Sequence, residues 1–194
     1  HEGEDACVIN AANALGDGWL TLIAPRHPHR GPDIAAVCNR APLRSLNQWP
    51  SADRNLYIMD SFGEMGSLFS LADLTVLGGS FVPKGGHNPL EPAAFGLPII
   101  TGPHIFKNTA EFAGLRNSGV VFDMIDDWAE PARTGRVLAN MAIAITKDKA
   151  QYRRIASAAK TYAATAIKRS NDAAKMIAAI APAPKTICEK DLKK

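Results

Sequence analysis

The sequence of 194 residues has few cysteines and no long apolar run, and each shortage excludes a class of protein. Its three cysteines, Cys7, Cys38 and Cys188, are odd in number, far apart and outside any CxxC pair. A disulfide framework or a zinc site is therefore not indicated, and a reducing cytoplasm fits best. No apolar run approaches the roughly 20 residues that span a bilayer, so we expect the chain as given to be soluble.

Several common catalytic motifs are also missing. The glycine-rich stretch at 78–92 matches neither the P-loop GxxxxGK[ST] nor the dinucleotide fingerprint GxGxxG, which argues against an ATPase or an NAD enzyme. Ser80 lies in no GxSxG elbow, and the opening HEGE is not HExxH. His27 and His29 have no partner at metal-ligand spacing, so we expect no metal.

Charge and length set further bounds. The net charge is +3, with both signs interspersed before a Lys-rich C-terminus, which gives no case for a nucleic-acid binder. A hydrophobic content of 46% is enough for a real core, and we expect one compact domain over 1–181 with a disordered tail over 182–194. The sequence opens on charged residues without an initiator Met, so we expect a fragment whose upstream part is missing.

Short apolar runs alternate with helical patterns through the first two thirds of the chain. The runs expected as strands are Trp19–Ala24, Pro42–Leu46 (weak), Leu56–Met59, Leu74–Gly79, Pro98–Thr101 and Val120–Phe122. The segments expected as helices are Asp5–Leu15, Asp33–Asn39, Met65–Ala72, Pro89–Phe95, Asn108–Asn117, Trp128–Ile145, Lys149–Ala166 and Asn171–Ile180. This order predicts an α/β fold, a doubly wound parallel sheet covered on both faces and followed by C-terminal helices.

The stretch from Gly78 to Pro92 carries the strongest local signal. It leaves an apolar strand through a turn with four glycines, which free the backbone for positive φ and close approach to a ligand. Asn88 fits the N-cap of the next helix, Pro89 its first position, and Glu91 the third position of a capping box. Free N–H groups at a helix start attract anions, so the stretch predicts an anion site.

Two other strand-to-helix turns should lie beside it. Pro25 and Arg26 follow one expected strand, and Ser61 with Glu64 gives a second capping signature after another. Because the carboxyl ends of parallel strands meet at one edge, the three turns should surround one crevice.

The residues of this crevice suit a nucleotide. Arg26 is a permanent cation, and Glu64 or Glu91 could bind sugar hydroxyls. Taken singly, each has a simpler interpretation, because the carboxylates fit helix caps and Arg26 fits a solvated surface charge. Their expected convergence favours the binding site.

The same motifs resemble a known family. The string GGSFVPKGGHNPLEPAAFGLPIITGPHIFKNTAEF at 78–112, APRHP at 24–28 and DSFGEMGSLFSLAD at 60–73 are similar to the C-terminal domain of the bacterial 3-deoxy-D-manno-octulosonic acid (Kdo) transferases. The opening HEGED also looks like the start of that domain. The resemblance implies a Rossmann-like half of a GT-B glycosyltransferase that moves Kdo from CMP-Kdo, with inversion, to a lipid A precursor in lipopolysaccharide inner-core synthesis.

The resemblance also implies which residues bind the donor. It places the CMP contacts on Pro25, Arg26, Phe62, Gly63, Glu64, Asn88, Pro89, Leu90 and Glu91. We expect Arg26 at the phosphate, Glu91 at the ribose hydroxyls, and Phe62 packed on the base or ribose. No cofactor beyond the donor substrate is implied.

Other parts of the family's machinery are expected outside this sequence. The family's catalytic carboxylate lies in an N-terminal acceptor domain that is preceded by a membrane anchor. The chain alone is therefore expected to bind CMP or CMP-Kdo without transfer, and its parent to work at the cytoplasmic face of the inner membrane. Two alternatives stay open: a nucleotide-binding or interaction module without catalysis, and a GT-B enzyme that uses a UDP-sugar.

Overall fold

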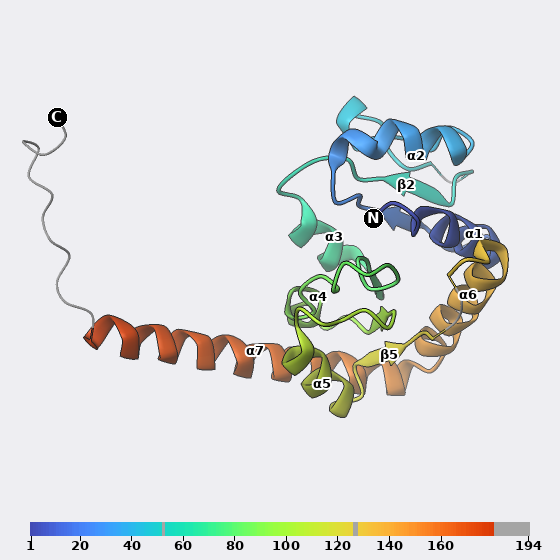
Figure 1. The fold of residues 1–194 in the computed structure, drawn as a ribbon. Helices are drawn as coiled ribbons and strands as arrows, with labels where there is room; N and C mark the ends of the chain where they lie inside the picture. Colours follow the sequence, from blue (N-terminus) through green and yellow to red (C-terminus); the bar gives the residue numbers. More distant parts are fainter. Residues whose placement is uncertain (52, 126–127, 181–194) are drawn as a thin grey trace, which may run out of the picture.

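The computed structural model describes residues 1–51, 53–125 and 128–180 as helices alternating with short strands (Figure 1). The strands are β1 (Thr21–Ile23), β2 (Leu56–Ile58), β3 (Thr75–Leu77), β4 (Ile99–Thr101) and β5 (Val121–Asp123). The helices are α1 (Asp5–Leu15), α2 (Gly31–Val37), α3 (Met65–Leu71), α4 (Leu90–Ala94), α5 (Thr109–Asn117), α6 (Pro131–Lys147) and α7 (Lys149–Ile180). The tail expected over 182–194 lies outside the described residues.

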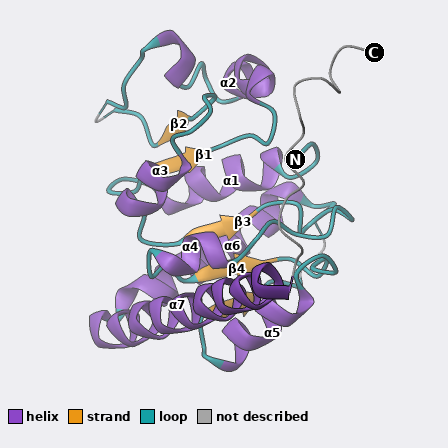
Figure 2. Cartoon of the chain, turned by 90° about the vertical axis from the view of Figure 1, so that its left-hand side faces the viewer, coloured by secondary structure: helices purple, strands orange, loops and turns teal. Residues whose placement is uncertain are grey.

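All strand pairs are parallel and are joined through helices. β1 pairs with β2, and β4 lies between β3 and β5, so the described strands form one two-stranded and one three-stranded sheet (Figure 2). The predicted α/β fold with parallel strands is confirmed, with its strands hydrogen-bonded as two sheets. Every strand-to-helix turn within a sheet lies at the same edge of that sheet, because its strands run in one direction.

Helices cover both faces of the three-stranded sheet. Neighbouring side chains of a strand point to opposite faces, and both Ile99 and Ile100 are fully buried. Ile99 packs in a cluster with Phe112 of α5 and Ala159 of α7, whereas Ile100 packs in another with Leu138 of α6. Burying an isoleucine side chain contributes about 1.5–3 kcal/mol, so β4 ties the two layers together.

Helix α1 joins the two sheets. Its Ala12 belongs to the cluster around β1 and β2, while the preceding Ala11 belongs to the cluster of Ile100 and α6. Gly135 of α6 permits the close crossing of α1, since a Cβ there would lie 2.5 Å from the Cβ of Asn10. The two sheets therefore share one continuous packing through α1.

Two expectations about secondary structure are wrong. The expected strand at Pro42–Leu46 is a single parallel bridge from Leu43 to Ile58 followed by a 3₁₀ turn, because the turn at Arg44–Leu46 ends the extended backbone. The two last expected helices are one, α7, since no glycine or proline interrupts residues 167–170. The second half of α7 projects away from the body of the chain (Figure 1).

No helix in the described ranges combines the length and the apolar character that crossing a membrane requires.

Candidate functional site

The turn after β3 is closed tightly on itself. The Gly86 N–H donates to the Gly79 carbonyl at 2.8 Å, and the His87 N–H donates to the Gly78 carbonyl at 3.3 Å. Gly79, Gly85 and Gly86 have φ of 72°, 93° and 72°, values that L side chains rarely adopt. The structure therefore requires glycine in this turn for its backbone conformation, as the sequence predicted.

A buried carboxylate fills the inside of this turn. Glu4 is 4% exposed, and its carboxylate accepts hydrogen bonds from the Gly79 N–H at 2.9 Å and the Phe81 N–H at 3.1 Å. Bonds from backbone N–H groups to a carboxylate are charge-assisted and about twice as strong as neutral ones. Two N–H groups of the glycine turn are thus satisfied by Glu4. Sequence reasoning missed this residue, although HEGED at the chain start holds it.

Ser80 anchors the turn to the neighbouring strand. Its Oγ donates to the Leu77 carbonyl at 2.5 Å and accepts from the Gly102 N–H, after β4, at 2.9 Å. Asn108, the N-cap of α5, adds longer bonds of 3.4 Å from its Nδ2 to the carbonyls of Gly86 and His87. These contacts hold the turn against the end of β4.

The helix start after the turn differs slightly from the expectation. Helix α4 begins at Leu90, one residue later than predicted, and Asn88 accepts the Leu90 N–H on its Oδ1 at 3.0 Å. Pro89 is buried, while Glu91 in the first turn is exposed. Because α4 has only five residues, its dipole is small, and its contribution to an anion site is mainly free N–H groups.

The end of β1 brings a cation to the same region. Arg26 is exposed and Pro25 is half-buried. The positive charge of Arg26 contributes to a lowered pKa of His87, after the larger effect of burial. That the two turns converge on one ligand site stays a prediction.

The turn after β2 has an exposed aromatic ring and a carboxylate that is already hydrogen-bonded within the chain. Phe62 is 84% exposed, and Gly63 has φ of 82° with open space around it. Glu64 Oε1 accepts bonds from Nε and Nη2 of Arg44 at 3.1 and 3.0 Å, and Glu64 Oε2 accepts a short bond from the Ser61 hydroxyl. The Ser61 bond and then the Arg44 bond hold the pKa of Glu64 below its usual value.

Glu64 therefore does not form the expected capping box. Ser61 donates to the Glu64 side chain, and α3 begins after Glu64, at Met65. Any sugar hydroxyl at Glu64 would share the carboxylate with Arg44. The Cζ atom of Arg44 lies over the Trp49 ring, 5.2 Å from the ring centre. Arg44 is a second residue that sequence reasoning missed, because it approaches from 20 residues away.

A buried aspartate fixes the backbone beside Arg44. Asp60 is 5% exposed and accepts from the Ser45 N–H at 2.8 Å and the Ser45 hydroxyl at 2.5 Å. Gly31 leaves room for it, since a Cβ at Gly31 would lie 2.5 Å from the Asp60 Cβ. The position of Arg44 opposite Glu64 thus depends on buried contacts of Asp60, after β2, with Ser45 and with Gly31 at the start of α2.

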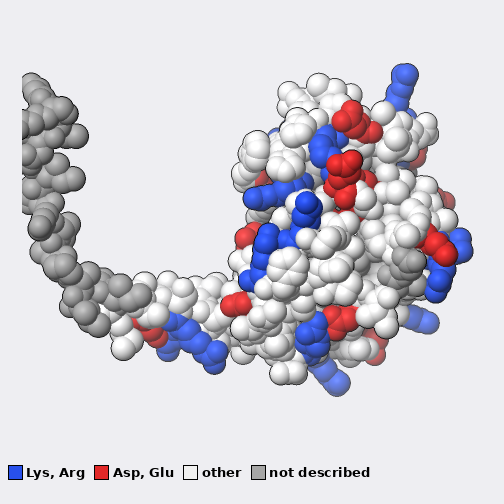
Figure 3. All heavy atoms as spheres, in the orientation of Figure 1, with Lys and Arg blue, Asp and Glu red and all other residues white. Residues whose placement is uncertain are grey.

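The predicted residues stand on three turns at strand ends, and each turn offers a different group. Figure 3 shows Lys and Arg side chains near the level of α3 on one face of the molecule, with Asp and Glu side chains beside them. The turns together offer a guanidinium at Arg26, an exposed ring at Phe62 and an exposed carboxylate at Glu91. These are groups that contact the phosphate, base and ribose of a nucleotide.

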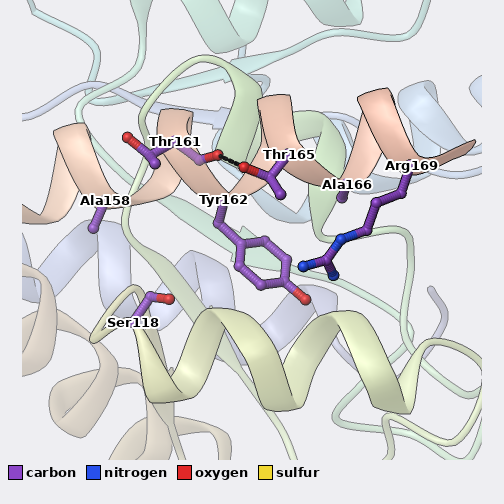
Figure 4. A pocket seen from close by; sticks show the side chains of 7 residues that line it. All are labelled: Ser118, Ala158, Thr161, Tyr162, Thr165, Ala166 and Arg169. Carbon is purple, nitrogen blue, oxygen red and sulfur yellow. Dashed lines mark hydrogen bonds between the residues drawn. The ribbon is translucent and has the colours of Figure 1, made fainter. Parts of the chain in front are cut away.

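A separate surface pocket lies away from these turns. It has a volume of about 330 Å³ between the end of α5 and helix α7, and Figure 4 shows Tyr162 of α7 pointing toward α5 with Arg169 beside it. Gly114 is required here, because a Cβ would lie 2.0 Å from the Tyr162 hydroxyl. None of the predicted CMP contacts lines this pocket.

Within the part of the chain that the structure describes, no three His, Cys, Asp or Glu side chains are grouped to hold a metal ion. That a metal is not needed stays a prediction.

Comparison with curated proteins supports the motif resemblance. The sequence is 38% identical over 114 residues to the 3-deoxy-D-manno-octulosonic acid transferase of Haemophilus influenzae, covering 55% of this chain and 27% of that protein. It is 46% identical over 106 residues to the protein of the same name from Rickettsia conorii, covering 53% and 22%. A probable mitochondrial 3-deoxy-D-manno-octulosonic acid transferase of Arabidopsis thaliana is 38% identical, covering 54% and 26%. No protein-family model matches the sequence.

A solved structure has the same fold. It is described as the C-terminal CMP-Kdo binding domain of WaaA from Acinetobacter baumannii, and it matches with a TM-score of 0.73 at 24% identity, over 84% of each chain. The similarity to the Kdo transferases expected from the motifs is thus confirmed in sequence, and the α/β fold in structure. The chain spans about a quarter of the length of the curated relatives it matches.

Proposed function

We propose that this chain is the donor-binding part of a glycosyltransferase that moves Kdo from CMP-Kdo to a lipid A precursor. The observation that carries the proposal is that Arg26, Phe62 and Glu91 each follow the carboxyl end of a parallel strand, in a chain similar to Kdo transferases. The similar solved structure is itself named for binding CMP-Kdo.

Each turn has a role in this proposal. The exposed guanidinium of Arg26 binds the phosphate, since a planar cation with several donors suits phosphate oxygens. The exposed ring of Phe62 packs on the base or ribose, and Gly63 beside it lets the nucleotide approach the backbone. Glu91 accepts hydrogen bonds from ribose hydroxyls.

The remaining predicted contacts shape the pocket. Pro25 and Pro89 fix the backbone on either side, and Asn88 holds the Leu90 N–H at the start of α4. Glu64 is held in place by Arg44 and offers its remaining acceptor capacity to the ligand. Asn88 and Glu64 are therefore held in place before the donor arrives, which lowers the entropy lost when they bind it.

Transfer itself needs groups that the resemblance places elsewhere. In the family, the catalytic carboxylate belongs to the N-terminal acceptor domain, which also contacts the lipid A precursor and follows a membrane anchor. We assign no catalytic residue, metal or cofactor to this chain. In this proposal the parent enzyme works at the cytoplasmic face of the bacterial inner membrane, and the chain supplies the CMP-Kdo site.

Calorimetric titration with CMP, UMP and UDP tests the proposal. We expect CMP to bind about tenfold or more tightly than either uridine nucleotide, a difference of about 1.4 kcal/mol. A preference for UDP would replace the proposal with a UDP-sugar transferase. Binding of none of the three would leave a module without a nucleotide site.

A further inference from the structure

Two histidine rings meet on the glycine turn after β3. The Nε2 atoms of His1 and His87 are 3.1 Å apart, and the rings are nearly parallel, at 12°, with centres 5.1 Å apart. Gly79 makes room for both rings, since a Cβ there would lie 3.2 Å from His1 Nε2 and 3.6 Å from His87 Nε2. The turn thus forms a cradle for an imidazole pair.

The pair is surrounded by more positive than negative charge. Arg26 after β1 and Lys107 after β4 both lower the pKa of His87, in addition to the larger effect of burial. The carboxylate of Glu4 is the opposing charge. It already bonds the N–H groups of Gly79 and Phe81, so its charge is shared between these donors.

We propose that the His1–His87 pair, with Arg26 and Lys107, forms a proton-linked subsite for a phosphate group. The proposal rests on the proposed function, since the phosphate is that of CMP. When the phosphate enters, one imidazole nitrogen takes a proton from water, and the proton returns to water when the phosphate leaves. The anion neutralises the surrounding cations, which favours the charged imidazole.

The hydrogen bond within the pair limits it to one added proton. A contact between two Nε2 atoms needs one ring to donate and the other to accept. A single extra proton preserves that contact when it binds the opposite nitrogen of one ring, whereas two charged rings would repel each other. The pair can therefore take up one positive charge when a phosphate binds.

This behaviour suits the charge change in the transfer reaction. The donor carries a phosphate diester with one negative charge, and breaking the bond between the sugar and the phosphate oxygen leaves CMP as a monoester with a charge near −2 at neutral pH. The growing charge falls where the subsite can take up a proton.

Histidine NMR titration of the whole chain tests this subsite directly. The pKa of His87 is measured in chloride, in sodium sulfate at equal ionic strength, and with saturating CMP, and exposed His29 serves as an internal control. We expect CMP to raise the pKa of His87 by about one unit or more and sulfate to raise it less, with His29 unmoved. Sulfate has no ionisation in this pH range, so its effect reports on the imidazole alone.

The outcomes separate this inference from the proposed function. If CMP binds and the pKa of His87 does not move, the subsite is wrong and the nucleotide site stands. If CMP does not bind but sulfate raises the pKa of His87, the subsite stands and the nucleotide assignment falls. An unmoved His87 with neither ligand bound removes both.

A second measurement uses variants. Relative to His87→Gln, the wild-type affinity for CMP should rise up to about tenfold between pH 8 and pH 6, because a shift of one pKa unit corresponds to a factor of ten. The ionisation of the CMP phosphate is common to both proteins and drops out of the ratio. His29→Gln should follow the wild type, and a ratio that is constant with pH would overturn the proposal.

Discussion

The turns after β3 and after β2 both leave a parallel strand at its carboxyl end, yet they are built differently. The turn after β3 encloses the buried carboxylate of Glu4 and is tied to the end of β4 by Ser80. The turn after β2 exposes Phe62 and holds Glu64 through a partly exposed ion pair with Arg44. The first is fixed by backbone contacts in the interior, and the second by side chains at the surface.

This difference separates two tasks within one proposed site. A turn fixed from inside gives a constant position to groups such as His87 and Asn88. A turn held by surface side chains leaves an exposed ring free to adjust to a base. Changes to the interior contacts that fix the first turn should therefore affect stability most, and changes at the second turn should affect binding most.

The largest expected effect is the loss of Glu4. Glu4→Ala leaves the N–H groups of Gly79 and Phe81 buried without a partner, and each such group costs about 1–3 kcal/mol. We expect a loss of about 3 kcal/mol in the free energy of unfolding, measured in urea. The control is Glu91→Ala, at an exposed position, which should change it by less than about 0.5 kcal/mol. Equal effects would remove the distinction between interior and surface contacts.

A matched pair of glycines sharpens the comparison. Gly86 and Gly63 both have positive φ, so an alanine at either costs about 1 kcal/mol in backbone strain. A Cβ at Gly86 would also lie 3.3 Å from Phe112 Cε2, whereas a Cβ at Gly63 meets nothing within 4 Å. We expect Gly86→Ala to destabilise the chain by about 1 kcal/mol more than Gly63→Ala in urea unfolding. The opposite order would contradict the tighter packing of the turn after β3.

Arg44 tests the second turn through binding. Arg44→Ala removes the partner that positions Glu64, and we expect about a threefold weaker affinity for CMP by calorimetry, since exposed ion pairs contribute little. The urea midpoint should stay unchanged, and Arg44→Lys should restore part of the affinity. A large loss of stability with unchanged affinity would show that Arg44 serves the fold alone.

The smallest effect is expected in the pH dependence of stability, and its window differs between the turns. The pKa of His87 lies below the ordinary 6.5, so protonation favours the unfolded chain and stability falls as the pH drops below 6.5. The pKa of Glu64 lies below the ordinary 4.5, so its contribution is present above pH 4.5 and is lost only as the pH falls through the folded value. Urea unfolding from pH 8 to pH 4 should show the first loss in the wild type but not in His87→Gln. A loss shared by both proteins would assign it to another group.

Local patterns predicted much of this structure. Alternating apolar runs and helix signals located all five described strands, and glycines located the turns that need positive φ. Local patterns did not predict the contacts between residues that are distant in the sequence. Glu4 bonds Gly79, 75 positions away, and Arg44 bonds Glu64, 20 positions away. The residues next to Glu4 and Arg44 in the sequence do not indicate these partners. The weak strand at 42–46 was wrong for the same reason, since buried Asp60 holds Ser45 in a turn there.

The central claim is that a nucleotide binds across the strand-end turns, with its phosphate at Arg26. The most direct test is a calorimetric titration of CMP into the wild type, Arg26→Ala and Arg169→Ala, the last being an arginine that lines the pocket between α5 and α7. We expect Arg26→Ala to weaken CMP binding by about tenfold or more, since a charged hydrogen bond contributes about 1.5–3 kcal/mol, and Arg169→Ala to bind as the wild type does. Unchanged binding in Arg26→Ala together with a loss in Arg169→Ala would place the nucleotide in the α5–α7 pocket and contradict the account.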